Sequence, residues 1–400
     1  MRLVIIGAGF AGMYAALSSA RLRDIKDVSP EALEISLVAP EPTLVVRPRL
    51  YEAKPETMTA RLEDVLKAID VVYVQGRAEK VDTKSCAVEV VTSKGTRTLS
   101  YDRLVIASGS RQFRPNIPGL AERGFSVYEL DDAIALDRHL HGLADRPASK
   151  ARDTVVIAGG GFTGIEAATE MPARLRTILG TNAKPRVIIV ERGEAIAPDM
   201  GAGPRPIIED ALHKLGVEAR LGASIAAVDE SGVTFADGER IESATVVWAA
   251  GLRAAPLTAQ IPAERDNLGR LLVDRDLRVP TVPGVFATGD AAKAECDDVG
   301  NYALMSCQHA TRMGAFAGNN AAAELLGVPT KPYHQEAYCT CLDLGDAGAL
   351  FTRGWDRKVE MVGAQAKTTK REINTVWIYP PRAERAAALA AADPEHVTEI

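Results

Sequence analysis

Two stretches of the chain decide its fold: residues 1–12 read MRLVIIGAGFAG, and residues 154–164 read TVVIAGGGFTG. Each begins with a short run of branched apolar residues, which is typical of a buried parallel strand. Each run ends in a G-x-G-x-x-G turn, and a helix-like sequence follows it. One such turn alone is a weak signal, but a strand, this turn and a helix occurring twice in one chain predict two βαβ units.

The spacing of the next strand supports this duplication. A second apolar run follows each turn, as residues 34–39 (EISLVA) and as residues 186–191 (RVIIVE). Ala39 follows the last glycine of the first turn by 27 residues, and Glu191 follows the last glycine of the second turn by the same 27. Equal spacing in both copies predicts that the two units share one architecture.

The glycines of such a unit have separate tasks. The first allows the tight turn, the second lets the backbone approach a pyrophosphate, and the third lets the helix pack on the strand. The pyrophosphate then meets free N–H groups at the positive end of the helix. A glycine-rich turn that merely packs tightly is the alternative, and the duplication disfavours it. The candidate cofactor contacts are therefore Gly7, Gly9, Phe10, Ala11 and Gly12 in the first unit and Gly159, Gly161, Phe162, Thr163 and Gly164 in the second.

The ends of the second strands indicate which nucleotide each unit binds. An acidic residue there is expected to bond the ribose hydroxyls of NAD and to repel the extra phosphate of NADP. Glu191 has this position in the second unit and favours NADH, whereas its neighbour Arg192 would offset part of the repulsion and leaves NADPH as an alternative. In the first unit the position holds Ala39, so either Glu41 or backbone and water must meet the ribose.

Composition excludes several classes of protein. The 400 residues carry a net charge of −6, and the lysines and arginines are scattered, so no nucleic-acid partner is indicated. We find no signal-peptide cleavage pattern and no run of about 18 apolar residues that would span a membrane. Five scattered cysteines form no disulfide framework, and no histidine has ligands at zinc spacing, so we expect a cytoplasmic protein without a metal site.

We therefore expect an α/β protein with two Rossmann-like dinucleotide-binding domains and a smaller C-terminal α+β domain. Alternating segments such as CAVEVVT and GVTFADGERI predict a small antiparallel sheet on each unit, and CTCLDLGDAGALF predicts strands of the C-terminal domain. The expected domains are a discontinuous FAD-binding domain over 1–118 and 280–330, an NAD(P)H-binding domain over 119–279, and a C-terminal domain over 331–400.

The chain resembles the two-dinucleotide-binding-domain flavoproteins, the group that contains glutathione reductase-like enzymes. The resemblance rests on YDRLVIASGS (101–110), VVWAAGL (246–252) and VPGVFATGDAA (282–292), together with both glycine turns. It implies FAD in the first unit and a nicotinamide dinucleotide in the second. The further cofactor contacts that it implies are Ala107, Ser108, Gly109, Ala250, Gly251, Gly289 and Asp290.

Within that group the chain resembles the type II NADH dehydrogenases. The segments that carry this likeness are CQHA (307–310) and TGIE (163–166). The resemblance implies that Gln308 and His309 lie at the edge of the flavin ring and that Glu166 stands near the nicotinamide. For Glu166 a purely structural role on its helix is an equal alternative. Arg47, in a loop expected over the flavin, is either a flavin contact or part of a surface salt bridge.

The expected reaction is hydride transfer from NADH to FAD, followed by electron transfer to a quinone or another acceptor. One alternative is a sulfide:quinone oxidoreductase-like enzyme with Cys307, Cys339 or Cys341 as redox thiols. The second glycine turn with Glu191 argues against it, because that chemistry needs no NADH. Cys339 and Cys341 would share one face of a strand, where packing is favoured over redox work. A ferredoxin or rubredoxin reductase and a slow redox sensor resembling apoptosis-inducing factor are the others.

The C-terminal sequence bears on membrane attachment. Type II NADH dehydrogenases usually carry amphipathic C-terminal segments, but residues 371–400 contain only a brief apolar patch at 376–379, which Pro380 and Pro381 interrupt. A strong interfacial helix would need large apolar residues on one face and basic residues on the other. A peripheral position on the inner face of the membrane, a soluble acceptor and a homodimer all stay open at this point.

Overall fold

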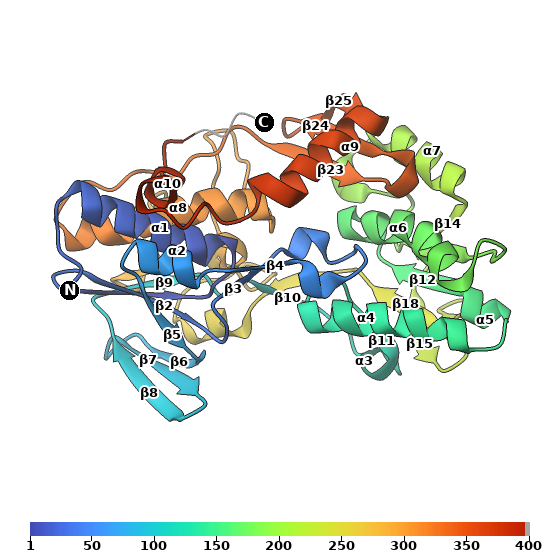
Figure 1. The fold of residues 1–400 in the computed structure, drawn as a ribbon, viewed down its shortest axis with the longest axis horizontal. Helices are drawn as coiled ribbons and strands as arrows, with labels where there is room; N and C mark the ends of the chain where they lie inside the picture. The colour runs from blue at the N-terminus through green and yellow to red at the C-terminus, as the bar shows by residue number, and fades with distance from the viewer. Residues whose placement is uncertain (397–400) are drawn as a thin grey trace.

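The computed structural model describes residues 1–396, and it contains the two predicted units side by side (Figure 1). The first unit is built on a five-stranded sheet in the order β21-β9-β1-β2-β5, in which every neighbouring pair is parallel. Parallel strands connected through covering helices are typical of dinucleotide-binding units. Its strands are β1 (Arg2–Ile6), β2 (Glu34–Ala39), β5 (Val72–Gln75), β9 (Arg103–Ile106) and β21 (Val285–Ala287), and its helices are α1 (Phe10–Ile25), α2 (Glu63–Ala68) and α8 (Cys307–Leu325).

The second unit repeats this plan. Its sheet has the order β11-β18-β12-β13-β14, again with all neighbours parallel. In both units the first strand, the glycine turn and the helix follow one another as the sequence predicts. The strands are β11 (Gly124–Phe125), β12 (Thr154–Ala158), β13 (Arg186–Val190), β14 (Val217–Arg220) and β18 (Thr245–Trp248), and the helices are α3 (Leu120–Arg123), α4 (Leu130–Gly142), α5 (Lys150–Asp153), α6 (Phe162–Leu179) and α7 (Arg205–Leu215).

Small antiparallel sheets complete the units. One three-stranded sheet projects from the edge of the first unit, and another lies on the second, as the alternating sequence segments predict (Figure 1). A two-stranded sheet joins the units. The strands are β6 (Arg77–Asp82), β7 (Ala87–Thr92) and β8 (Gly95–Ser100) in the first sheet, β15 (Ile225–Asp229), β16 (Gly232–Phe235) and β17 (Arg240–Glu242) in the second, and β10 (Ser110–Gln112) and β19 (Leu252–Ala254) in the joining sheet.

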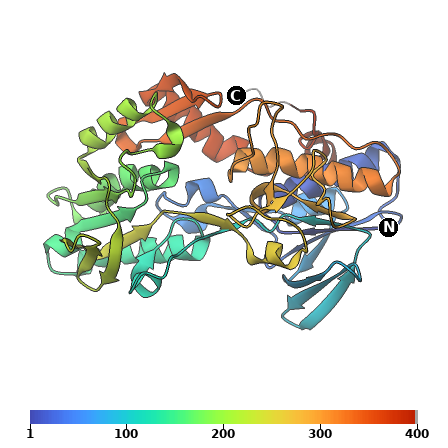
Figure 2. The same cartoon turned by 180° about the vertical axis from the view of Figure 1, so that it is seen from behind.

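The C-terminal segment packs on both units. Its sheet of β23 (Cys339–Asp343), β24 (Ala349–Arg353) and β25 (Lys358–Val362), with α9 (Gly363–Glu372), lies over α6 (Figures 1 and 2). Leu342 and Leu350 of this sheet belong to the core of the second unit. After the π-helical turn η8 (Ile373–Trp377), the chain returns to the first unit, where α10 (Arg385–Ala390) packs its Leu389 into that core. Among residues 1–396 no helix has the length and apolarity that crossing a bilayer requires.

The core positions also bear on the expected domain boundaries. Leu257, Ile261 and Leu271 pack in the core of the first sheet, although they fall within the range 119–279 assigned to the second unit. We propose that the chain re-enters the first unit directly after β19, near residue 255. The sequence did not reveal this return because residues 255–279 form only a short 3₁₀ helix (η5, Pro256–Gln260) and a two-residue strand (β20, Leu271–Leu272), without the strand and helix of the repeating pattern.

Close packing of α8 against α1 depends on two glycines of α8. A Cβ atom on Gly314 would lie 2.3 Å from the Ala11 carbonyl oxygen, and one on Gly318 would lie 2.1 Å from that of Ala15. Only glycine fits such an approach between two helices, so the spacing of these glycines sets the contact. The first turn of α1, which contains Ala11, is thereby held against the middle of α8.

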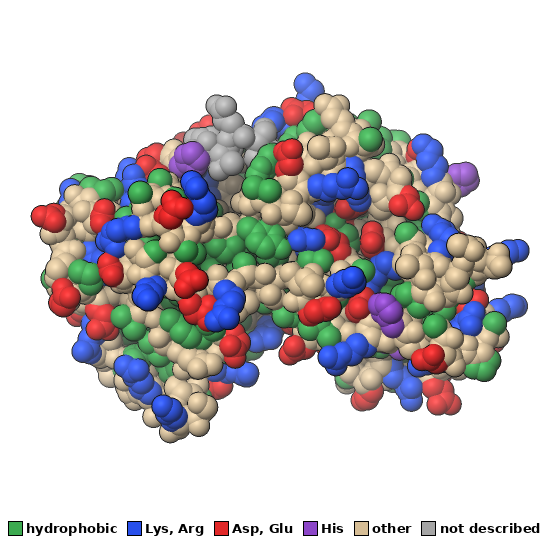
Figure 3. All heavy atoms as spheres, in the orientation of Figure 1, with side chains coloured by type: hydrophobic (Ala, Val, Ile, Leu, Met, Phe, Trp, Pro, Cys, Tyr) green, Lys and Arg blue, Asp and Glu red, His purple; other side chains and the backbone are tan. Residues whose placement is uncertain are grey.

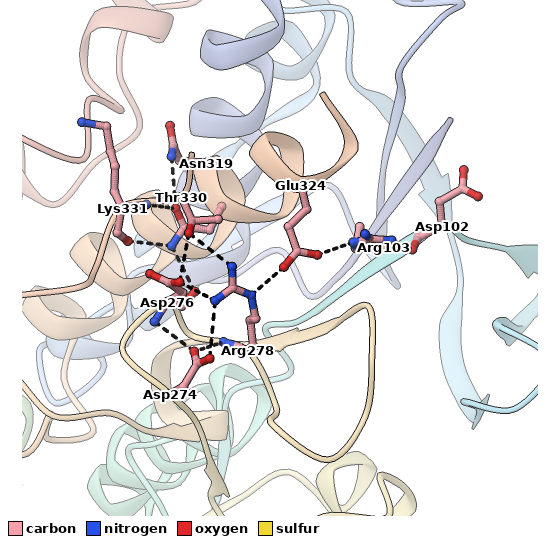
Figure 4. Close-up of polar contacts among 10 residues, drawn as sticks. Asp102, Arg103, Asp274, Asp276, Arg278, Asn319, Glu324, Thr330 and Lys331 are labelled. Atoms are coloured by element: carbon pink, nitrogen blue, oxygen red, sulfur yellow. Dashed lines mark hydrogen bonds and ion pairs between the residues drawn. The ribbon is translucent and has the colours of Figure 1, made fainter. Parts of the chain in front are cut away.

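An ion-pair cluster anchors the opposite end of α8 (Figure 4). Glu324 accepts from Arg278 Nε at 2.5 Å and from Arg103 Nε at 2.5 Å. Arg278 also bonds Asp276 and lies 3.5 Å from an Asp274 carboxylate oxygen. The cluster therefore joins α8, β9 and the turn that precedes β21.

Replacing Arg278 by Met should destabilise the protein by about 1–2 kcal/mol, because three carboxylates lose their shared partner at a half-buried site. The melting temperature measured by differential scanning calorimetry checks this. The matched control is Lys80→Met, which removes an exposed pair with Glu89 and should leave the melting temperature unchanged. Equal effects of the two substitutions would show that the cluster in Figure 4 is not a structural anchor.

Candidate functional site

A cavity of about 1080 Å³ lies where the two units and the C-terminal segment meet. Its wall includes the first turns of α1, α6 and α8, which are the helix ends that the glycine motifs and the close packing of α8 bring together. Its lining is mainly apolar, with a few charged side chains. The sequence-predicted site residues on its wall are Gly9, Phe10, Ala11, Arg47, Ala107, Gly109, Phe162, Thr163, Glu166, Asp290 and Gln308.

The first glycine turn has the geometry that a pyrophosphate requires. A Cβ atom on Gly12 would lie 1.9 Å from the Gly7 carbonyl oxygen, so α1 packs too closely on its turn for any other residue. At Gly9 a Cβ atom would meet nothing within 4 Å and would stand in the cavity. The N-cap Gly9 has no side chain to accept from the helix N–H groups. These N–H groups are thus available to an anion at the positive end of α1.

The second turn repeats this arrangement at α6. A Cβ atom on Gly164 would lie 1.9 Å from the Gly159 carbonyl oxygen, and one on Gly161 would lie 3.4 Å from an Asp199 carboxylate oxygen. Glu191 accepts hydrogen bonds from the backbone N–H of Gly160 at 2.8 Å and of Gly193 at 2.7 Å. Its carboxylate is therefore held beside the turn, where the ribose of a dinucleotide would lie.

Asp290 follows β21 in the segment VPGVFATGDAA and lies on the cavity wall. Ser110 donates to the Asp290 carboxylate at 2.6 Å, and burial raises the pKa of this carboxyl. The hydroxyls of Ser108 and Thr288 are buried without a hydrogen-bond partner among the described residues. A carboxyl group and unbonded hydroxyls on the two segments that carry Ser110 and Asp290 suit a polyhydroxylated chain such as ribityl.

Arg47 is a bridging residue on the cavity wall. Its Nε donates to the Tyr128 carbonyl oxygen at 2.9 Å, and its guanidinium lies 3.9 Å from Asp290 and 3.7 Å from Glu129. It therefore joins the loop after β3 (Thr43–Val45) to the second unit. This position is compatible with both roles considered for Arg47, a flavin contact and a salt bridge. The Arg47–Asp290 pair is partly buried and borders the cavity.

Other predicted contacts lie around the cavity with different degrees of exposure. Gly289 packs its Cα against Ala11, where a Cβ atom would lie 2.7 Å from that of Ala11. Ala250 and Gly251 follow β18 beside the second turn, with Ala250 Cβ 3.0 Å from the Cβ position of Gly159. Glu41 is exposed after β2 and does not line the cavity.

Glu166 is buried at the cavity wall and has a partner that sequence reasoning did not identify. Lys370 of α9 donates to its Oε1 at 2.8 Å, and the two side chains are 6 % and 4 % exposed for lysine and glutamate respectively. Burial raises the pKa of Glu166 to about 7, although Lys370 opposes that shift. Burial alone would lower the pKa of Lys370, but the carboxylate outweighs it and raises that pKa. A carboxyl that titrates near neutral pH suits proton transfer.

A second buried acidic residue, Asp343, contacts Glu166 through its backbone. The backbone N–H of Asp343 donates to Glu166 at 3.0 Å. The Asp343 side chain accepts from the Tyr51 hydroxyl at 3.1 Å and from the Lys367 ammonium. Tyr51 comes from the loop that carries Arg47, so Asp343 connects the first unit, α6 and the C-terminal sheet.

Gln308 and His309 are placed differently. Gln308 lines the cavity and donates from Nε2 to Cys339 Sγ at 3.2 Å. His309 is fully buried, does not line the cavity, and packs against Tyr338 with ring centroids 5.0 Å apart. Burial lowers the pKa of His309 to about 3, so its ring is neutral. The structure gives Gln308 a position at the site and His309 a packing position.

The three cysteines near the cavity are protonated thiols. All five cysteines of the chain are free, and Cys307, Cys339 and Cys341 line the cavity. Burial raises the pKa of Cys307 to about 11 and that of Cys341 to about 12. Because the thiolate is the reactive form, this environment disfavours thiol redox chemistry.

Comparison with known proteins agrees with this geometry. The family model for pyridine nucleotide-disulphide oxidoreductases matches residues 1–314. An NADH dehydrogenase-like protein of Mycobacterium tuberculosis is 47 % identical over 98 % of both chains, and a type II NADH:quinone oxidoreductase of the same species is 31 % identical over 72 % of this chain and 66 % of its own. The solved structure of NDH2 from Plasmodium falciparum with NADH superposes with a TM-score of 0.79 at 15 % identity, covering 98 % of this chain and 97 % of its own. The chain belongs to the pyridine nucleotide-disulphide oxidoreductase family.

Proposed function

We propose that this protein is an NADH dehydrogenase that binds FAD at the first glycine turn and NADH at the second, and delivers the electrons to a quinone. One observation carries the proposal: residues of both glycine turns line a single cavity together with the C-terminal segment. Two nucleotides held by these turns would bring their redox rings together in that cavity. The names of the M. tuberculosis relatives support the same reaction.

The chain's own residues bind, orient and shield the reactants. The N-termini of α1 and α6 each offer free N–H groups to one pyrophosphate. Phe162 and the apolar wall exclude water between the two turns. Bound FAD would supply the chemistry, since a flavin accepts hydride and passes electrons to a second acceptor.

Reduction of a quinone also consumes protons, and we assign the supply of one proton to Glu166. Its carboxyl borders the cavity and titrates near neutral pH. Lys370 Nζ is bonded to the same Oε1 and would stabilise the carboxylate that remains after proton release. The role of Glu166 is thus a proton donor at the acceptor side, with Lys370 as its positioning partner.

An apolar rim gives the acceptor a route to the cavity. Trp377 and Ile378 line the cavity, and the adjacent Val376 is 64 % exposed. Figure 3 shows hydrophobic side chains gathered in the middle of one face, between the two halves of the molecule. Such a rim suits an apolar quinone and a peripheral position on the inner face of the membrane.

Glu191 should set the preference for the nicotinamide cofactor. Replacing it by Ala removes the ribose contact and also the acceptor for two backbone N–H groups, so KM for NADH should rise roughly tenfold or more. KM for NADPH should rise much less, because a charge that repels the extra phosphate disappears as well. Steady-state kinetics with both nucleotides check this. An equal loss with NADH and NADPH would remove Glu191 from the ribose.

Acceptor specificity tests the proposed reaction. Purified protein should oxidise NADH with a naphthoquinone such as menadione and should show little reduction by sulfide, because its cavity thiols are protonated. NADH consumption is followed by absorbance, and sulfide with the quinone alone serves as the comparison. Reduction of quinone by sulfide at a rate equal to that with NADH would overturn the proposal in favour of sulfur chemistry.

A further inference from the structure

Arg357 is a charged side chain on the cavity wall that the proposed reaction does not use. It lies in the turn between β24 and β25, is only 9 % exposed, and lines the cavity. Its backbone is left-handed, with φ of 59°. A residue other than glycine is rarely held in this conformation unless its surroundings require it, and such positions concentrate at binding sites.

The guanidinium of Arg357 lacks an acidic partner among the described residues. Its Nη1 is buried without a hydrogen bond, and no carboxylate among residues 1–396 forms an ion pair with it. Its Cζ lies 4.3 Å from the centroid of the Tyr338 ring, so the aromatic ring is its neighbour in place of a counter-charge. Burial of an unpaired charge is costly, so a buried guanidinium without a counter-charge points to a ligand that supplies one.

The other cations on the cavity wall already have partners. Lys370 bonds Glu166, Arg47 lies near Asp290, and Arg312 donates to the carbonyl oxygens of His334 and His396. The two pyrophosphates are provided for separately by the N-termini of α1 and α6. Among the described cations of the cavity wall, Arg357 is therefore available to bind a further anion.

The surroundings of Arg357 offer additional hydrogen-bonding capacity. Tyr338 stacks on Trp355 with centroids 4.7 Å apart, and Trp355 Nε1 is buried without a partner among the described residues. His309 packs on Trp355 from outside the cavity wall, with ring centroids 5.8 Å apart. The cluster stands beside Gln308 and Cys339, at the part of the cavity formed by the C-terminal segment and α8.

We propose that Arg357 is an anion-binding residue that recognises an acidic group, a carboxylate or its equivalent, on the electron acceptor. This inference rests on the proposed function, because it assigns the charge to the acceptor of that reaction. A guanidinium fits a carboxylate through two parallel N–H donors, and the Tyr338 ring holds it in position. The preferred acceptor is then an aromatic quinone that carries an acidic side group.

A matched pair of acceptors tests the proposal. One is 2-methyl-1,4-naphthoquinone with a carboxyethyl group at its third position, and the other is its methyl ester, whose quinone ring is the same. In Arg357→Met, KM for the acid should rise roughly 10- to 100-fold, the effect of losing a hydrogen-bonded charge pair. KM for the ester and KM for NADH should stay the same, and Arg357→Lys should recover part of the affinity for the acid.

A binding measurement separates this proposal from the proposed function. The probe is 2-naphthoate, which carries an acid but no quinone. Calorimetry should show that it binds at least tenfold more weakly to Arg357→Met than to the flavin-loaded wild type. This result is expected whether or not NADH reduces the flavin. Flavin content and melting temperature of the variant should equal those of the wild type. A rise in KM for NADH alone, loss of flavin, or equal binding of 2-naphthoate to both proteins would overturn the proposal.

Discussion

Gly9→Val should yield a folded, colourless protein. A Cβ atom at Gly9 meets no protein atom within 4 Å, and its φ of −74° and ψ of −174° are open to a branched side chain. The chain itself therefore tolerates the valine. The side chain would stand in the cavity at the positive end of α1, where the FAD pyrophosphate is proposed to lie, so we expect flavin content to fall by at least about tenfold.

Two further variants make this result specific. Gly142→Val adds the same side chain at another open position, at the end of α4 and away from the cavity, and should keep its flavin. Gly161→Val fills the corresponding position in the second unit, so it should keep flavin but be reduced by NADH far more slowly. Visible absorbance of the purified proteins and their melting temperatures provide the measurements. Full flavin content in Gly9→Val would contradict the proposed FAD site.

Lys370→Met should slow reoxidation of the reduced protein by a quinone at least about tenfold, because the Glu166 carboxylate that remains after proton release loses the ammonium that stabilises it. Reduction by NADH should change little, because Lys370 contacts Glu166 and neither glycine turn. Stopped-flow absorbance separates the two half-reactions. Lys367→Met, which removes the ammonium bonded to Asp343, is the matched control and should have a much smaller effect.

The rate of reoxidation should depend on pH through the protonation of Glu166. Glu166 is a proton donor only in its neutral form, which is present below its pKa of about 7. Reoxidation of the wild type should therefore be fastest at acidic pH and decline as pH rises through about 7. Loss of Lys370 removes a cation that lowers the pKa of Glu166, so the decline should move to higher pH in Lys370→Met. A wild-type profile that is flat across neutral pH would exclude Glu166 as the donor.

The sequence was sufficient for the two sheets because each depends on a local pattern. Strand, glycine turn and helix are contiguous at residues 1–25 and 154–179, and both appear where the pattern predicts them. The Glu166–Lys370 pair could not be predicted in this way, since 204 residues separate its members. Only packing of the C-terminal sheet on α6 brings the lysine to the glutamate.

The two α8 residues show a different limit of sequence reasoning. Gln308 and His309 are neighbours in a motif, but adjacent residues on a helix point about 100° apart. Gln308 therefore faces the cavity while His309 packs against Tyr338. Arg357 gave no sequence signal, because its burial depends on a turn in a sheet whose register was unknown.

An anaerobic titration of the purified protein with NADH tests the central proposal most directly. The protein should carry FAD, and about one equivalent of NADH should bleach its visible absorbance, because the two turns would hold both nucleotides in one cavity. Addition of menadione should then restore the colour. A bound flavin that stays oxidised in excess NADH, yet is bleached by dithionite, would contradict the proposed transfer between the two sites.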